Sequence, residues 1–191
     1  LRFFRFHATF GGDKIDPDAI KACRDLAPRL IELSSERVQS ELFKILDAPN
    51  PADTLALMDN ELILKHVLPE AKNFGRLKML AWIETKFSNS DCIRPDKLRR
   101  LAAVLNSDQT GHKALAKRLR LSNKQSLRLA TMTKSTQLPV PELNQLKRQQ
   151  VLYDLGTDTF RNQALLSWAH EKNIESHLPP ERKNHWLSLI N

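Results

Sequence analysis

Apolar residues recur at intervals of three and four along almost the whole chain. Within residues 34–48 the apolar positions with this spacing are Val38, Leu42, Ile45 and Leu46. Such spacing places side chains on one face of a helix, and it recurs in residues 98–105 and 160–168. No segment alternates apolar and polar residues as a strand does, and no Asn-Gly or Asp-Gly pair marks a hairpin. We therefore predict an all-α fold of about eight to ten short helices without a sheet.

Capping residues mark where these helices begin and end. Asp16 and Asn50 each precede a proline, which suits the first helical turn. Gly156 is expected to end one helix. The other residues expected to cap a helix start are Ser34 or Ser35, Ser122 and Thr157.

The chain opens on the aromatic and basic run LRFFRFHATFGG. As a helix it has two adjacent apolar faces, one with Leu1, Phe4 and Ala8 and the other with Phe3, Phe6 and Phe10. Gly11 and Gly12 would end this helix. A helix apolar over so much of its circumference needs partners on more than one side. We expect the rest of the chain to cover one face, and a segment preceding Leu1 to cover the face of Phe3, Phe6 and Phe10.

The composition indicates a folded protein with a polyanionic partner. The hydrophobic content of 41% suits a globular domain, and no apolar run is long enough to span a membrane. The net charge of +8 and pI of about 9.7 favour nucleic acid as the partner. Cys23 and Cys92 lie far apart in the chain, which suits reduced thiols and a cytoplasmic location.

Positive charge is concentrated between Gln109 and Pro141, where no Asp or Glu occurs. A stretch of one sign over two adjacent helices predicts a surface that faces phosphates. The alternative is a solvated face whose countercharges come from elsewhere in the fold. The basic residues of this stretch are Lys113, Lys117, Arg118, Arg120, Lys124, Arg128 and Lys134.

The same stretch also has the pattern of a helix-turn-helix, with a turn near Leu121. Ala114, Leu115 and Leu119 would lie in its first helix. If the basic residues face phosphates, we expect Leu115, Leu119 and Leu127 to point inward. The turn lacks the usual Gly, and the second helix lacks the Gln, Asn and Arg cluster expected for reading bases. A DNA-binding regulator and a helical scaffold that binds protein remain alternative functions.

No set of residues predicts catalysis or metal binding by this segment alone. Asp16 and Asp18 imitate a metal-binding carboxylate pair, but Pro17 between them cannot lie in a central strand. We interpret Asp16 as a helix cap and Asp18 as a first-turn acid. The six His residues lack the spacing of metal ligands. Trp82, Trp168 and Trp186 each lie on an apolar stripe, which favours a role in the core.

Three motifs in order resemble the bacterial-type CCA-adding tRNA nucleotidyltransferases and their poly(A) polymerase relatives. They are LRFFRFHATFGG at the start, LSSERVQSEL at residues 33–42, and LPEA at residues 68–71. The sequence LRLSN at residues 119–123 is also similar to this family. The resemblance covers most of residues 1–135.

The resemblance implies roles for particular residues. Arg2 corresponds to the second Arg of the family's E-D-x-x-R-x-x-R motif, so Arg2 and Arg5 would be a remnant of the nucleotide site. The signature of the helical neck is carried by Ser34, Glu36, Arg37 and Glu41. In the family the catalytic head precedes the neck, which implies that a head domain belongs before Leu1. Residues 1–70 would then form the neck, and residues 71–191 the body and tail.

The family reaction adds CMP and AMP from CTP and ATP to RNA 3′ ends with Mg²⁺. The resemblance implies an RNA partner, in particular tRNA gripped through its phosphates by Lys113, Lys117, Arg118, Arg120, Lys124 and Arg128. Since the catalytic carboxylates of the family lie in the head, we expect the present segment to be inactive by itself and to hold no cofactor. CCA addition and poly(A) synthesis remain open alternatives for the parent enzyme.

Overall fold

Every regular element described by the computed structural model is helical. It describes residues 1–11, 15–88, 92–106, 109–133, 140–175 and 177–190, and within them one isolated antiparallel bridge joins Ala71 to Leu105. The all-α prediction is confirmed. The elements, in chain order, are α1 (Arg2–Phe10), α2 (Pro17–Leu26), the 3₁₀ segment η1 (Ala27–Glu32), α3 (Ser35–Asp47), α4 (Pro51–Asn60), the 3₁₀ segment η2 (Leu64–His66), α5 (Phe74–Lys86), α6 (Lys97–Val104), α7 (Gln109–Arg118), α8 (Asn123–Thr133), α9 (Gln145–Leu155), α10 (Thr157–Ile174) and α11 (Pro180–Ile190).

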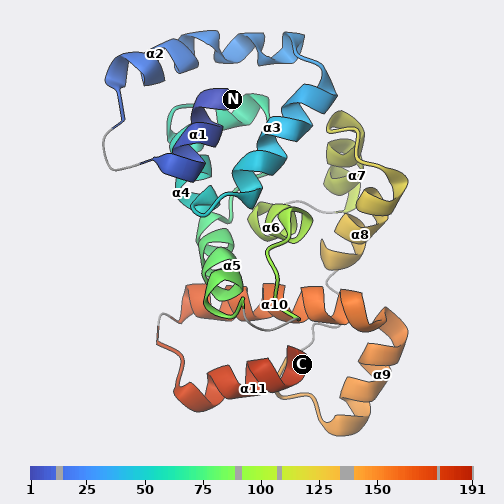
Figure 1. Cartoon of the computed structure of the whole chain (residues 1–191). Helices are drawn as coiled ribbons and strands as arrows, with labels where there is room; N and C mark the ends of the chain where they lie inside the picture. Colours follow the sequence, from blue (N-terminus) through green and yellow to red (C-terminus); the bar gives the residue numbers. More distant parts are fainter. Residues whose placement is uncertain (12–14, 89–91, 107–108, 134–139, 176, 191) are drawn as a thin grey trace.

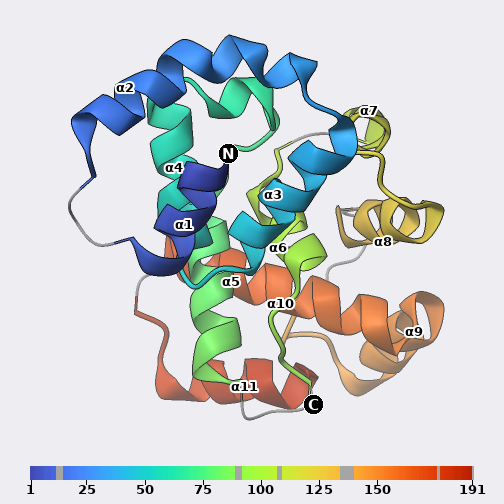
Figure 2. The same cartoon turned by 45° about the horizontal axis from the view of Figure 1, so that its top comes forward.

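The helices are arranged around α5, α6 and α10 (Figure 1). Helices α1 to α4 lie at one end, where α1 packs against α3 and α4, and α9 and α11 lie at the other. Helix α5 packs against both α4 and α10 and so joins the two ends (Figure 2). Helices α7 and α8 lie beside this column, with α8 packed on α6 and α10. The predicted boundary at residue 70 falls between η2 and α5 and stays a prediction.

Most of the predicted helix ends are confirmed. The Asp16 carboxylate accepts from the Asp18 amide at the start of α2, and the Ser34 hydroxyl accepts from the Arg37 amide at the start of α3. Ser122 begins α8 with a reciprocal pair of bonds to Gln125, which is a capping box. Asn50 precedes α4 without a side-chain cap.

Gly156 ends α9 as predicted, but the cap assigned to Thr157 is wrong. Gly156 itself is the residue that precedes α10, and no side chain caps that helix. Its φ of +73° lies in the left-handed region, which glycine adopts without a steric penalty. One glycine therefore serves both helix ends.

Two helices end on a left-handed residue that is not glycine. Arg120 has a φ of +48° after α7, and Leu62 has a φ of +58° after α4. After α7 the Leu121 amide bonds to the Ala116 carbonyl and the Arg120 amide to the Lys117 carbonyl. This is the Schellman pattern, and it recurs at Leu62. Here the hydrogen bonds hold side-chain-bearing residues in a conformation that usually selects glycine.

A buried ionic network joins four helices at the centre of the molecule. Glu84 of α5 is fully buried and bonds to Arg99 and Arg100 of α6, each with an N–O distance of 2.6 Å. Arg100 also donates to the carbonyls of Leu46 and Ala48 at the end of α3. Arg99 donates to Asn162 Oδ1 of α10 at 2.8 Å. The network therefore binds the α3 end of the molecule to α10.

Candidate nucleic-acid interface

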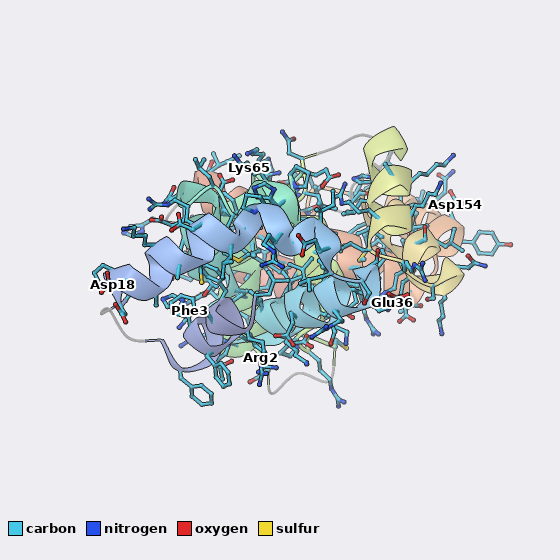
Figure 3. The ribbon with its side chains drawn as sticks, turned by 90° about the horizontal axis from the view of Figure 1, so that it is seen from above. Arg2, Phe3, Asp18, Glu36, Lys65 and Asp154 are labelled. Carbon is cyan, nitrogen blue, oxygen red and sulfur yellow. The ribbon has the colours of Figure 1, made fainter. Side chains whose placement is uncertain are left out.

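A groove between α1 and the start of α3 brings the two sets of motif residues together. It encloses about 540 Å³. Figure 3 shows Arg2 and Phe3 of α1 and Glu36 of α3 around this part of the molecule. The residues of this α1–α3 groove that carry charge or hydrogen-bonding groups are Arg2, Glu36, Arg37, Ser40 and Glu41.

Glu41 connects the two helices at the floor of the groove. Its Oε1 accepts from Arg5 Nη1 at 3.3 Å and from Lys44 Nζ at 3.1 Å. Its Oε2 is buried and accepts no hydrogen bond from the residues that the structure describes. A buried carboxylate oxygen without a donor is costly. The cations of the groove that are open to a ligand are the exposed Arg2 and Arg37.

Helix α1 has one covered face and one open face. Phe4 and Ala8 are buried against the rest of the chain. Phe6 and Phe10 are 50% and 77% exposed and stack on each other with ring centroids 6.4 Å apart. Phe3 is half-buried and makes a T-shaped pair with Phe4. The expectation of an exposed aromatic face is thus confirmed for Phe6 and Phe10.

The start of α3 also holds the turn between α7 and α8. The amide of Gln39 donates to the Leu119 carbonyl at 2.9 Å. Glu36 pairs with Arg120 at 2.6 Å. Its pKa is lowered first by a hydrogen bond from its own backbone amide and further by the Arg120 guanidinium. Helix α3 thus connects the groove with the α7–α8 unit, residues 109–133.

The three arginines of the predicted phosphate-facing set bind carboxylates from distant segments. Arg118 pairs with Glu70 at 2.5 Å, Arg120 with Glu36, and Arg128 with Asp96 at 2.8 Å. Asp96 is also the N-cap of α6, where it accepts from the Leu98 and Arg99 amides. For these three arginines the structure therefore matches the alternative interpretation of the basic stretch, in which countercharges come from elsewhere in the fold.

The three lysines of the same set remain available. Lys113, Lys117 and Lys124 are exposed, and none makes an ion pair with the residues that the structure describes. Leu115 and Leu119 point inward as predicted, but Leu127 is 68% exposed, so its predicted burial is wrong. The cause is that α8 buries Leu129 and Met132 instead. Lys134 and Gly12 lie outside the described residues.

The predicted role in the core is confirmed for two of the three tryptophans. Trp168 and Trp186 are each 1% exposed and stack on each other with centroids 6.3 Å apart. Trp82 is 43% exposed, so its assignment to the core is wrong. Trp82 lies on α5 beside Lys172 of α10. Its neighbours in the sequence are apolar, so the sequence pattern did not indicate that it is exposed.

The carboxylates near the start of the chain take structural positions. Asp16 caps α2, and Asp18 is exposed in its first turn. Within the described ranges, no group of three His, Cys, Asp or Glu side chains is placed to hold a metal ion. No described helix is both long and apolar enough to cross a membrane.

Sequence reasoning missed the residues that position this interface. Gln39, Glu70 and Asp96 each hold part of the α7–α8 unit, through partners 80, 48 and 32 residues away in the chain. The only indication of these residues in the sequence is indirect. The basic stretch contains no acids, so its countercharges must come from other segments. The pattern does not say which acids supply them.

The part of the chain that forms α2 to η2 matches a known protein family. Residues 14–74 match a family model described as "Probable RNA and SrmB- binding site of polymerase A". This segment contains the neck signature and one wall of the α1–α3 groove. No curated protein matches the chain significantly. The match confirms the resemblance seen in the sequence over residues 14–74, which are similar to this region of polymerase A.

Proposed function

We propose that this chain is the RNA-binding helical part of a template-independent RNA nucleotidyltransferase that adds CMP or AMP to RNA 3′ ends, with tRNA as its RNA. The observation that carries the proposal is the family match over residues 14–74, which includes the wall of a groove containing Arg37 and Glu41. Arg2 supplies a cation from the opposite wall.

RNA phosphates and ribose groups suit the donors and acceptors of the groove. Arg2 and Arg37 are exposed cations that can pair with phosphates. The exposed Ser40 hydroxyl of the groove can bond to a ribose 2′-hydroxyl, the group that distinguishes RNA from DNA. Lys113, Lys117 and Lys124 would extend the contact along the α7–α8 unit. Contacts of this kind grip the backbone and tolerate many sequences.

The transfer reaction itself would depend on a catalytic head domain. In this proposal the head precedes Leu1 and covers the exposed Phe6 and Phe10. Mg²⁺, CTP and ATP would bind there, because the resemblance to the nucleotidyltransferases places the catalytic carboxylates in the head.

The test is a filter-binding titration of the chain against tRNA and against duplex DNA over a range of salt concentrations. We expect preference for tRNA. We also expect Lys117→Ala and Lys124→Ala each to reduce the salt slope by about 0.7 to 0.9, because each removes the partner of one phosphate. Lys147→Ala, which removes an exposed lysine of α9, is the control and should leave the slope unchanged. Tight binding to one DNA sequence would instead support the helix-turn-helix regulator.

A protein partner is the second candidate, favoured by exposed apolar side chains in the matched region. Leu26 and Ile31 are 56% and 88% exposed on α2 and η1. The family description names SrmB together with RNA. If this edge binds SrmB, Ile31→Asp should abolish capture of the purified protein and leave tRNA binding unchanged. Equal capture by Ile31→Asp and the unaltered chain would exclude this edge.

A further inference from the structure

We propose that Trp82 and Lys172 form a second RNA site, which holds one base of a single-stranded segment against the Trp82 indole and its phosphate against the Lys172 ammonium. The inference deepens the proposed RNA-binding function and rests on it. The site lies on α5 and α10, outside residues 14–74 and outside the α7–α8 unit.

The site is a hollow with an aromatic wall. It encloses about 460 Å³ and is lined by Met79, Trp82, Lys172 and Asn173. That size falls within the range of about 300–1,000 Å³ typical of small-ligand sites. Met79 and Trp82 are three residues apart on α5 and therefore share one helix face. None of these four lining residues is acidic, so nothing in the wall repels a phosphate.

The exposed indole packs against a second aromatic ring. Phe87 meets it edge-on, with centroids 6.2 Å apart and planes at 85°. Phe87 in turn lies 5.3 Å from Trp168, which stacks on Trp186 in the core. A ring with such a neighbour has fewer rotamers to lose when a base stacks on it.

Two lysines flank these aromatic rings. Lys172 Nζ lies 4.5 Å from the centroid of the Trp82 ring, and Lys183 Nζ lies 5.0 Å from that of Phe87. Neither makes an ion pair with the described part of the chain. A cation over the face of an indole is attracted by the electrons of the ring. Because the ammonium lies over the face of the indole, a base that stacks on this face takes its place, and Lys172 then moves to the phosphate of that nucleotide.

An aromatic ring next to cations without acidic partners is the arrangement that binds single-stranded nucleic acid. Bases stack on the ring whatever their identity, and the cations follow the backbone. A duplex cannot use such a site, because its bases are already stacked. The structure therefore assigns this hollow to a single-stranded segment, separate from the phosphate contacts proposed for the α7–α8 unit.

The experiment measures binding of a short oligoadenylate and of tRNA to the 191-residue chain by fluorescence anisotropy, together with tryptophan emission. We expect the oligoadenylate to quench emission from the unaltered chain but not from Trp82→Leu, since Trp168 and Trp186 are buried. Trp82→Leu should weaken oligoadenylate binding about fivefold or more. Lys172→Gln should reduce its salt slope by about 0.7.

Tyr153→Leu is the matched control, because Tyr153 is an aromatic residue that is 90% exposed on α9. It should leave both measurements unchanged. Oligoadenylate binding by Trp82→Leu equal to that of the unaltered chain overturns the site. If Lys117→Ala still weakens tRNA binding in that case, the proposed function stands. Absence of any RNA binding by the unaltered chain overturns both the site and the proposed function. An acidic peptide is tested in the same assay, and stronger quenching by this peptide than by oligoadenylate overturns the assignment to RNA.

Discussion

At the scale of single residues, one aspartate serves two elements at once. Asp96 caps α6 through the Leu98 and Arg99 amides and pairs with Arg128 of α8. Burial alone would raise the pKa of Asp96, but the hydrogen bonds from Arg128 and from the Arg99 amide outweigh burial and hold that pKa below its ordinary value. The carboxylate is thus more stable in the folded chain than in the unfolded chain.

The depressed pKa of Asp96 makes the free energy of unfolding depend on pH. The unfolded pKa is about 3.9, so this contribution is fully present above that pH and is lost as pH falls through the lower folded pKa. We expect Asp96→Asn, which keeps a good capping residue, to lower the free energy of unfolding at pH 7. The difference should shrink as pH falls below about 4. Urea titrations at several pH values measure it, and a difference that stays constant with pH would contradict this role.

At the scale of elements, the α7–α8 unit is held by its turn. Arg120 adopts a left-handed conformation in the Schellman motif that ends α7, and Ser122 and Gln125 form the capping box that begins α8. Gln39 of α3 donates to the carbonyls of Leu119 and Arg120. The turn therefore keeps a fixed position although its sequence lacks glycine.

Replacing Arg120 tests the cost of that conformation. Arg120→Gly removes the clash between the side chain and the backbone, whereas Arg120→Ala loses the same Glu36 ion pair and keeps the clash. We expect the glycine variant to be more stable than the alanine variant by about 1 kcal/mol in chemical denaturation. An alanine variant as stable as the glycine variant would show that the turn relaxes to another conformation.

At the scale of the whole molecule, the sequence predicted the helices better than it predicted their contacts. The spacing of Leu42, Ile45 and Leu46 predicted α3, and all three are fully buried. A capping residue such as Ser34 acts on the next turn, so its role follows from local sequence. Long-range contacts leave no such pattern, and the exposure of Trp82 depends on where α10 crosses α5.

For the candidate site too, the sequence indicated the residues of the groove but not the ion pairs of the basic stretch. The motifs identified Arg2, Glu36, Arg37 and Glu41, and the fold brings them into one groove. Charge counting identified the basic stretch but could not separate its lysines from its arginines. That separation depends on Glu70 and Asp96, which approach only when the chain is folded.

The Glu84 network adds a buried ionic contact to the packing of α5 that joins the two ends of the molecule. Removing one partner of a buried ion pair typically costs about 3–5 kcal/mol, because the other charge is left without compensation. We expect Glu84→Gln to lower the free energy of unfolding by an amount of this order in chemical denaturation. Glu61→Gln, which breaks an exposed pair with Arg24, is the control and should change little. Equal stability of the two variants would contradict a central role for the network.

The central claim, that this chain binds RNA through the α1–α3 groove and the lysines of the α7–α8 unit, is tested most directly by photo-crosslinking tRNA to the chain and identifying the attached peptides by mass spectrometry. We expect attachment within residues 33–44 and within residues 113–128. Attachment confined to residues 141–190, with none in either segment, would contradict this claim.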